Sequence, residues 1–230
     1  MRTLLLAVCI CFLGCQSAPP PEPPEDGMVL LFDGKSLDNF EVKNGTAPYE
    51  IEDGVIVGTT AEGSPNTFLA TKREYGDFIL EFDVMVDPEL NSGVQIRSHE
   101  YAEDVTVRTV GDSRVYEDTH EAGRVHGLQV EISNEEAGTS GGIYDEARRG
   151  WVDNIVENPA ASKALKDNEW NHYRIEAVGD SIKTFVNGVP CADLVDSTDL
   201  AGFIGFQVHS YEGDSPKQVQ IGRASCRERV

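Results

Sequence analysis

Residues Asp77–Val86 read DFILEFDVMV, with an apolar side chain at every second position. Successive side chains of a β-strand point to opposite faces, so this period of two predicts a strand with one buried face. The side chains expected on that face are those of Phe78, Leu80, Phe82, Val84 and Val86. The opposite face includes Glu81 and Asp83 and is expected to be more polar.

Short runs of this kind fill the chain from Met28 to about Gln220 and are separated by turn residues. The dipeptides Asp53-Gly54 and Asn187-Gly188 are typical of two-residue hairpin turns. A short helix is expected at Pro159–Leu165. Further strands are predicted at Met28–Phe32, Tyr49–Glu52, Val55–Val57, Ser92–His99, Gly127–Ile132, Asn171–Val178, Ser181–Val186 and Phe203–His209. The pattern predicts one all-β domain over residues 28–220, an antiparallel β-sandwich of jelly-roll type.

Composition excludes several classes of protein. The chain has 230 residues, of which 40% are hydrophobic, enough to build a core. Its 19 Lys and Arg residues stand against 40 Asp and Glu residues, for a net charge of −21. Such a charge repels phosphate backbones, so nucleic acid is not expected as a partner. No apolar run reaches the roughly 18 residues needed to span a bilayer.

The N-terminal segment has the pattern of an export signal. Residues 1–15 read MRTLLLAVCICFLGC, a basic start followed by a short apolar run. The ending Phe12–Cys15 resembles a bacterial lipobox, in which Cys15 would be lipidated and become the new N-terminus. Residues 16–27 are rich in proline and predict an extended tether. We expect export to the bacterial cell envelope, with a lipid anchor on the periplasmic or outer-membrane side as the sole membrane contact; a plain signal peptide cut near Cys15 is the alternative.

The C-terminal segment has an unusual origin. Ile221–Val230 read IGRASCRERV, which matches the translation of a common sequencing-adapter sequence, and Gln220 is compatible with it because the codon CAG would supply the two bases that begin that adapter. We therefore expect residues 221–230 not to be encoded by the gene, the alternative being a genuine basic tail. Without both ends the domain remains strongly acidic, and Cys191 is its one cysteine, so no intramolecular disulfide is expected.

Three predicted strands carry an aliphatic face and a hydrogen-bonding face. In Ser92–His99 the polar face holds Gln95, Arg97 and His99. In Gly127–Ile132 it holds Gln129 and Glu131, and in Phe203–His209 it holds Gln207 and His209. If these strands lie in one sheet, they form an open ligand-binding face, which Glu81 and Asp83 could join. The alternative is an ordinary solvated face.

The segment Gly141–Trp151 (GGIYDEARRGW) adds side chains suited to a sugar. Tyr144 and Trp151 offer stacking surfaces, and Arg148 and Arg149 offer cationic donors, a combination typical of carbohydrate sites. The alternative is an arginine pair that neutralises Asp145, Glu146 and Asp153 in a surface cluster. His120 and His172 carry no functional signal. No spacing of His, Cys or Asp indicates a metal site, so no metal or other cofactor is predicted.

Six motifs follow one another along the chain: Leu30–Leu37 (LLFDGKSL), Asn91–Arg97 (NSGVQIR), Gly127–Ile132 (GLQVEI), Gly141–Tyr144 (GGIY), Glu169–Asn171 (EWN) and Gly205–His209 (GFQVH). In this order they resemble the motifs of the 3-keto-disaccharide hydrolase family. The resemblance extends from Leu30 to about Gln220, and it departs from the family where residues 221–230 begin. It implies a concanavalin A-like jelly roll and frequent export as a lipoprotein.

The implied activity is cleavage of glycosides that carry a ketone at C3 of the sugar. The ketone makes the C2 proton acidic, so a base can remove it, the C1 substituent leaves by elimination, and water can then add. For this chemistry the expected catalytic residues are Arg97 at the enolate oxygen, His99 and His209 as proton carriers, and Glu131 as a base, a histidine-orienting partner or a metal ligand. A divalent ion that is held by His and Glu against the keto oxygen is left as an alternative.

Substrate contacts are expected from the remaining polar and aromatic candidates, with a carbohydrate as the partner. These candidates are Gln95, His126 (which could also carry protons), Gln129, Tyr144, Arg148, Arg149, Trp151 and Gln207. Two alternatives use the same face: a non-catalytic carbohydrate-binding module, and a conventional glycosidase with two carboxylates.

The origin of the C-terminal residues is directly testable. We expect an independent read of the gene to diverge from this sequence after the codon for Gln220. A read that continues through the same ten codons would instead establish the tail as genuine.

Overall fold

A computed structural model describes residues 27–110, 115–134 and 138–228. The predicted signal segment, the lipidation site Cys15 and nearly all of the proline-rich tether lie outside the described residues. Within the described part, no helix is both long and apolar enough to cross a membrane.

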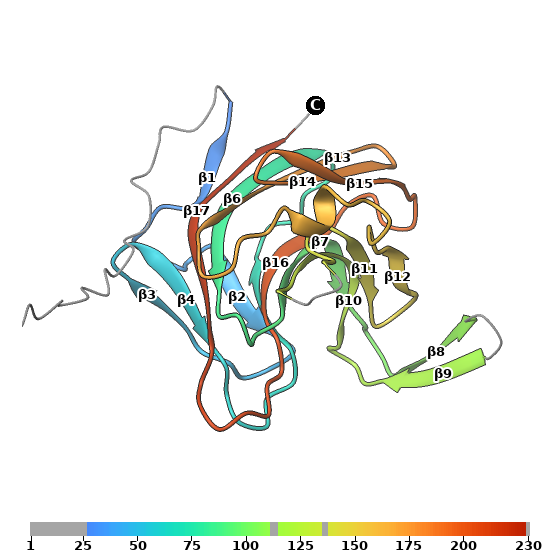
Figure 1. Cartoon of the computed structure of the whole chain (residues 1–230). Coiled ribbons are helices and arrows are strands. Elements are labelled where there is room, and N and C mark those ends of the chain that lie inside the picture. Colours follow the sequence, from blue (N-terminus) through green and yellow to red (C-terminus); the bar gives the residue numbers. More distant parts are fainter. Residues whose placement is uncertain (1–26, 111–114, 135–137, 229–230) are drawn as a thin grey trace, which may run out of the picture.

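The described residues form a two-layered β-sandwich (Figure 1). Sheet A has eight strands in the order β15-β14-β13-β6-β17-β4-β3, with β1 also paired to β17. Its strands are β1 (Val29–Phe32), β3 (Tyr49–Glu52), β4 (Val55–Thr59), β6 (Phe78–Val86), β13 (Asn171–Val178), β14 (Ser181–Val186), β15 (Val189–Val195) and β17 (Gln218–Glu228).

Sheet B has seven strands in the order β12-β11-β10-β7-β16-β5-β2. Its strands are β2 (Phe40–Lys43), β5 (Thr67–Thr71), β7 (Ser92–Glu100), β10 (Val125–Ile132), β11 (Ile143–Glu146), β12 (Gly150–Asp153) and β16 (Phe203–Val208). The strands β8 (Val105–Val110) and β9 (Val115–His120) pair only with each other and project from the sandwich as a hairpin (Figure 1). All the strand pairings are antiparallel, which confirms the predicted all-β jelly-roll class.

The alternation in β6 produces the main core. Phe78, Leu80, Phe82, Val84 and Val86 are all buried in the cluster between the sheets, as the sequence predicted. Phe82 joins the two layers: its ring stacks on Tyr173 of sheet A at 5.2 Å and meets Phe206 of sheet B edge-on at 5.4 Å.

The predicted turns are present, and the predicted helix is shorter than expected. Asp53-Gly54 and Asn187-Gly188 each take φ values between 50° and 80°, the left-handed geometry that a two-residue hairpin requires. The helix expected at Pro159–Leu165 is a single 3₁₀ turn at Ala161–Lys163. β17 runs through the adapter-like residues to Glu228, with a shift in its pairing to β6 between Ile221 and Ala224.

An irregularity in β7 overturns one prediction about the polar face. Arg97 has a φ of 48°, and the pairing of β7 shifts opposite Gly127 and again between Phe203 and Gly205. The strict alternation therefore ends after Ile96, and the prediction that Arg97 shares a face with Gln95 is wrong.

The Arg97 side chain is fully buried and binds loops of sheet A. Its Nε donates to the carbonyl of Gly76 at 2.9 Å, Nη1 donates to the carbonyl of Gly179 at 2.7 Å, and Nη2 donates to Asp77 Oδ1 at 3.1 Å. Burial lowers the pKa of Arg97, and the neighbouring Asp77 opposes that shift. The guanidinium thus fixes β7 of sheet B to both the start of β6 and the β13–β14 turn of sheet A.

Replacing this side chain should destabilise the sandwich. We expect Arg97→Met to lower the free energy of unfolding by about 3 kcal/mol, because it leaves two carbonyls and Asp77 without their donor. Urea unfolding measures the change. Arg108→Met is the control, since Arg108 pairs with Glu117 on the exposed hairpin and such pairs contribute under about 1 kcal/mol. Equal unfolding midpoints for Arg97→Met and the wild type would refute this structural role.

Candidate functional site

The face of sheet B that turns away from sheet A is concave. Phe68 and Ala70 of β5, Phe203 of β16 and Val125 of β10 form a second hydrophobic cluster, separate from the main core. The segments before β5 and after β2 reach across the sheet to β10 and β11, where the Val125 amide donates to Asn44 and the Asn66 amide donates to Glu146, so sheet B is curled. We call this surface the concave face.

A chain of hydrogen bonds runs along the concave face. Ser98 Oγ donates to Gln95 Oε1 at 2.6 Å, and Gln95 Nε2 donates to Gln129 Oε1 at 3.0 Å. Gln129 Nε2 in turn donates to Glu131 Oε2 at 3.1 Å, and the Asn91 amide donates to the other carboxylate oxygen. The amides thereby orient the carboxylate of Glu131.

The common face of Gln95, Gln129, Glu131 and Gln207 is confirmed, but the prediction that it lies open is wrong. All four side chains are buried, and Glu131, the most exposed of them, has 5% of its surface accessible. Loops from the far edge of the sheet cross the concave face and cover it. The Val125 amide donates to Asn44 Oδ1 at 3.2 Å, and Asn66 Nδ2 donates to Glu146 Oε1 at 3.4 Å.

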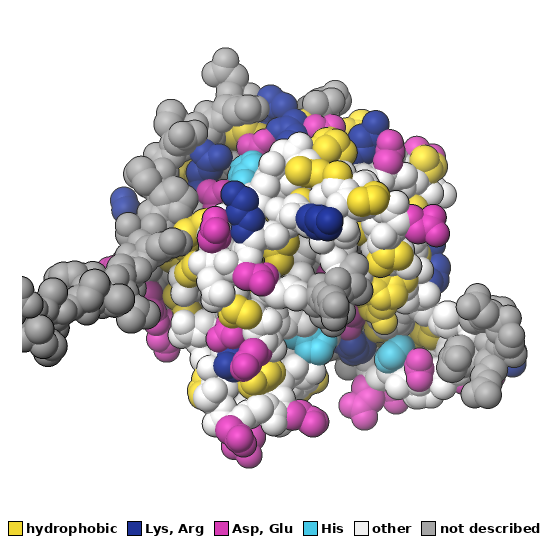
Figure 2. All heavy atoms as spheres, viewed as in Figure 1, with side chains coloured by type: hydrophobic (Ala, Val, Ile, Leu, Met, Phe, Trp, Pro, Cys, Tyr) yellow, Lys and Arg dark blue, Asp and Glu magenta, His cyan; other side chains and the backbone are white. Residues whose placement is uncertain are grey.

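A groove lies beside this cover. It has a volume of about 740 Å³, within the range of small-molecule sites, and its lining includes Asn66, Glu100, His120, Arg124 and His209. A smaller cavity of about 290 Å³ shares His120 and Arg124 with it and extends to Tyr144, Arg148 and Arg149. Figure 2 shows histidine side chains on both sides of a hollow near the hairpin.

His209 lies at the end of β16, and its Nδ1 is 2.7 Å from the carbonyl oxygen of Ser210. It is the one predicted proton carrier that lines the larger groove. His120, which the sequence did not single out, lines the groove from the hairpin, where its ring stacks on Tyr101 at 5.9 Å.

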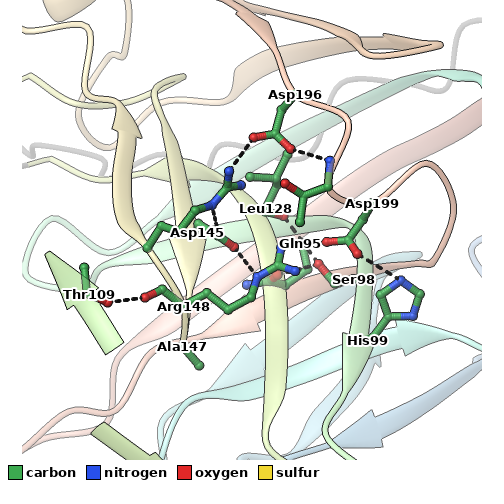
Figure 3. A network of polar contacts seen from close by, with 12 residues as sticks. Gln95, Ser98, His99, Thr109, Leu128, Asp145, Ala147, Arg148, Asp196 and Asp199 are labelled. Atoms are coloured by element: carbon green, nitrogen blue, oxygen red, sulfur yellow. Dashed lines mark hydrogen bonds and ion pairs between the residues drawn. The ribbon is translucent and has the colours of Figure 1, made fainter. Parts of the chain in front are cut away.

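His99 and His126 do not join the glutamines on the concave face. Following the irregularity at Arg97, His99 Nε2 lies 3.7 Å from Asp199 Oδ1 (Figure 3). The His99 ring is 5.9 Å from that of His126. His126 stacks on Tyr101 at 4.0 Å. Burial, followed by the charge of Arg148, lowers the pKa of His126 to about 4, so this imidazole is neutral at pH 7.

Arg148 and Arg149 are held in ion pairs. Arg148 lies between Asp145, at 2.8 Å, and Asp199, at 2.6 Å (Figure 3). Arg149 contacts Asp145 and lies 2.6 Å from Asp196. This geometry favours the interpretation of an arginine pair neutralised by carboxylates, although the partners beyond Asp145 are Asp196 and Asp199 rather than Glu146 and Asp153. The ion pairs fix the β11–β12 turn to the segment before β16.

Tyr144 and Trp151 form an aromatic pair beside the concave face. Tyr144 pairs with Gln129 across β10 and β11, and its ring meets that of Trp151 edge-on at 5.4 Å. Trp151 is 42% exposed, so it offers the ring surface expected of a sugar-stacking residue.

Glu81 and Asp83 lie in sheet A and do not join the concave face, contrary to the hypothesis from the sequence. Glu81 pairs with Arg174, and Asp83 lies 2.9 Å from the Nδ1 atom of His172. No second carboxylate for a conventional glycosidase therefore comes from β6.

The sequence did not single out Asn66 or Arg124, and it offered Glu146 only as an acidic partner of the Arg148–Arg149 pair. Arg124 pairs with Glu146, which also accepts from Asn66, so the three residues connect the two edges of sheet B. Glu146 lies two residues after Tyr144 on β11, so strand alternation could have placed both side chains on the same face. In the described part of the chain, no three His, Cys, Asp or Glu side chains are grouped to hold a metal ion.

Solved structures similar to this chain share its fold. A candidate glycosyl hydrolase from Parabacteroides distasonis is 20% identical, with a TM-score of 0.55 over 88% of this chain and 99% of that protein. A Bacillus subtilis protein with a galectin-like fold is 12% identical, with a TM-score of 0.56 over 84% and 91% of the two chains. A β-1,3-1,4-glucanase (lichenase) from a mouse hindgut metagenome is 11% identical, with a TM-score of 0.52 over 88% and 99%.

Sequence comparison gives the family. No curated protein matches the chain. The family model described as a 3-keto-alpha-glucoside-1,2-lyase-like domain matches residues 27–221, which include β1 to β16, and it ends at the residue where the adapter-like stretch begins. Because this match spans most of the chain, the protein belongs to the family of 3-keto-alpha-glucoside-1,2-lyase-like domains.

Proposed function

We propose that this protein cleaves 3-keto-glycosides, including 3-keto-disaccharides, by elimination across C1 and C2 followed by addition of water. The observation that carries the proposal is the buried chain Ser98–Gln95–Gln129–Glu131, which ends on an oriented carboxylate. These four side chains do not line the groove of about 740 Å³, which takes His209 and Arg124 from the same sheet. The family of the chain, 3-keto-alpha-glucoside-1,2-lyase-like, supports the same chemistry.

Each step has a candidate group. The Glu131 carboxylate removes the proton from C2, and the electron pair of that C–H bond passes to the C3 keto oxygen as an enolate. The enolate then reforms the ketone, the C1–O bond breaks, and His209 protonates the departing oxygen. The products are a free sugar or alcohol and a 1,2-unsaturated ketone, which regenerates a 3-keto sugar when water adds at C1.

Arg124 takes the role for which the sequence suggested Arg97. Each nitrogen of the Arg97 guanidinium donates a hydrogen bond within the protein, to Gly76, Asp77 or Gly179, whereas Arg124 lines the groove. Its Nη1 is buried and has no hydrogen-bond partner among the described residues. A guanidinium that stays charged can stabilise an enolate oxygen.

The site assignment is tested by substitution of the base and the acid. We expect Glu131→Gln and His209→Ala each to lower the turnover of 3-keto-trehalose by at least ~100-fold, measured as release of free monosaccharide. His172→Ala is the control and should retain wild-type turnover, because His172 pairs with Asp83 on sheet A. Wild-type rates in both site variants would exclude this assignment.

A second candidate function is carbohydrate binding without cleavage. The exposed Trp151 ring against Tyr144 favours it, since stacking gives affinity without chemistry. Saturable binding of 3-keto-trehalose with no monosaccharide released by the wild-type protein would favour this second function over the first.

We also propose that the protein acts in the bacterial cell envelope, anchored through a lipid on Cys15. The sequence of residues 1–15 and the proline-rich segment after it support the proposal. In cells, the full-length chain should fractionate with membranes. The Cys15→Ser variant has no lipidation site, so it should not fractionate with them. Equal membrane association of both proteins would contradict a lipid anchor.

A further inference from the structure

The Gln207 side chain is buried without any hydrogen bond. It is 0% exposed, and within the described residues neither its Nε2 nor its Oε1 atom has a partner. A buried amide of this kind is destabilising, because both atoms have lost their hydrogen bonds to water and form none within the protein. Gln95, equally buried in the neighbouring strand, has both amide atoms satisfied.

The position of Gln207 places its amide next to the candidate site. The residue follows Phe206, which faces the main core, so its own side chain lies on the concave face. Its neighbour across the strands is Phe68, and His209, two residues later, lines the groove. Ser92 Oγ donates to the Gln207 backbone carbonyl at 2.7 Å, which holds this part of β16 against β7.

Asn66 connects the groove to the strand beside Gln207, because it lines the groove and lies two residues before Phe68, the cross-strand neighbour of Gln207. Asn66, which contacts Glu146 at 3.4 Å, also accepts from the backbone N–H of Ser210 at 3.0 Å through its Oδ1. A hydrogen bond of 3.4 Å is weak, and hydroxyl groups of a ligand can replace it. For a ligand to reach Gln207, this contact and the neighbouring hydrogen bond from the Val125 amide to Asn44 have to open.

We propose that Gln207 is a specificity-determining residue for the oxidised sugar ring, with Nε2 donating to the C3 keto oxygen and Oε1 accepting from an adjacent ring hydroxyl. A ketone can only accept a hydrogen bond and a neighbouring hydroxyl can donate one, so the pair matches the donor and acceptor of a primary amide. This inference rests on the proposed function, since it takes the 3-keto-glycoside as the ligand.

The test compares Gln207→Leu with Gln95→Leu in the full chain. Gln207→Leu removes an amide that has no partner, so its urea midpoint should equal or exceed that of the wild type. Gln95→Leu breaks two hydrogen bonds, and its midpoint should fall. For 3-keto-trehalose, Gln207→Leu should lower kcat/KM by at least ~10-fold, the scale of one lost hydrogen bond.

The outcomes separate this inference from the proposed function. If the wild type cleaves 3-keto-trehalose and Gln207→Leu retains its kcat/KM, the specificity role is overturned and the function stands. If the wild type binds 3-keto-trehalose without cleaving it, the function fails, and a dissociation constant raised at least ~10-fold in Gln207→Leu still supports the role of Gln207. A midpoint that falls as far as that of Gln95→Leu, with unchanged binding, makes Gln207 a structural residue. A wild type that neither binds nor cleaves the sugar overturns both.

Discussion

The buried contact of Arg97 with Gly76, Asp77 and Gly179 is the interaction on which the arrangement of the candidate site depends. The backbone of β7 has a positive φ at Arg97, and this breaks the regular alternation of the strand and directs the Arg97 side chain toward these groups. Gln95, before this point, stays on the concave face, while His99, after it, lies beside Asp199. One irregular residue thus separates side chains that a regular strand would have kept together.

The curl of sheet B also shapes the candidate site, because it encloses polar side chains together with apolar ones. Phe68, Ala70, Val125 and Phe203 supply hydrophobic contacts, and the Gln95 amide donates one hydrogen bond to the Gln129 amide. Small residues permit this packing: a side chain on Gly93 would lie 2.5 Å from the Gln129 carboxamide. The concave face therefore encloses buried amides and a carboxylate beside a small hydrophobic cluster.

Local pattern in the sequence was enough for the elements whose signals are local. The period of two in Phe78–Val86 and the dipeptides Asp53-Gly54 and Asn187-Gly188 gave the class, several strands and two turns. The ordered motifs gave the family, which the match over residues 27–221 bears out. Alternation also placed Gln95, Gln129, Glu131 and Gln207 on one face.

Features that depend on distant parts of the chain could not be predicted in this way. The acceptors of Arg97 lie about 20 and 80 residues away in sequence, and nothing local to β7 indicates them. The cover formed by Asn44 and Asn66 depends on the curl of the whole sheet. The ion pairs of Arg148 and Arg149 with Asp199 and Asp196 likewise join segments that are remote in sequence.

The proposed cleavage begins when Glu131 takes a proton from C2 of a 3-keto sugar. Its most direct test is the reaction of 3-keto-trehalose in D₂O, with the product examined for deuterium by NMR and a sample without protein as the control. Elimination followed by addition of water predicts deuterium at C2 of the released 3-keto sugar, absent with Glu131→Gln. Release of a product that retains hydrogen at C2 would contradict the account.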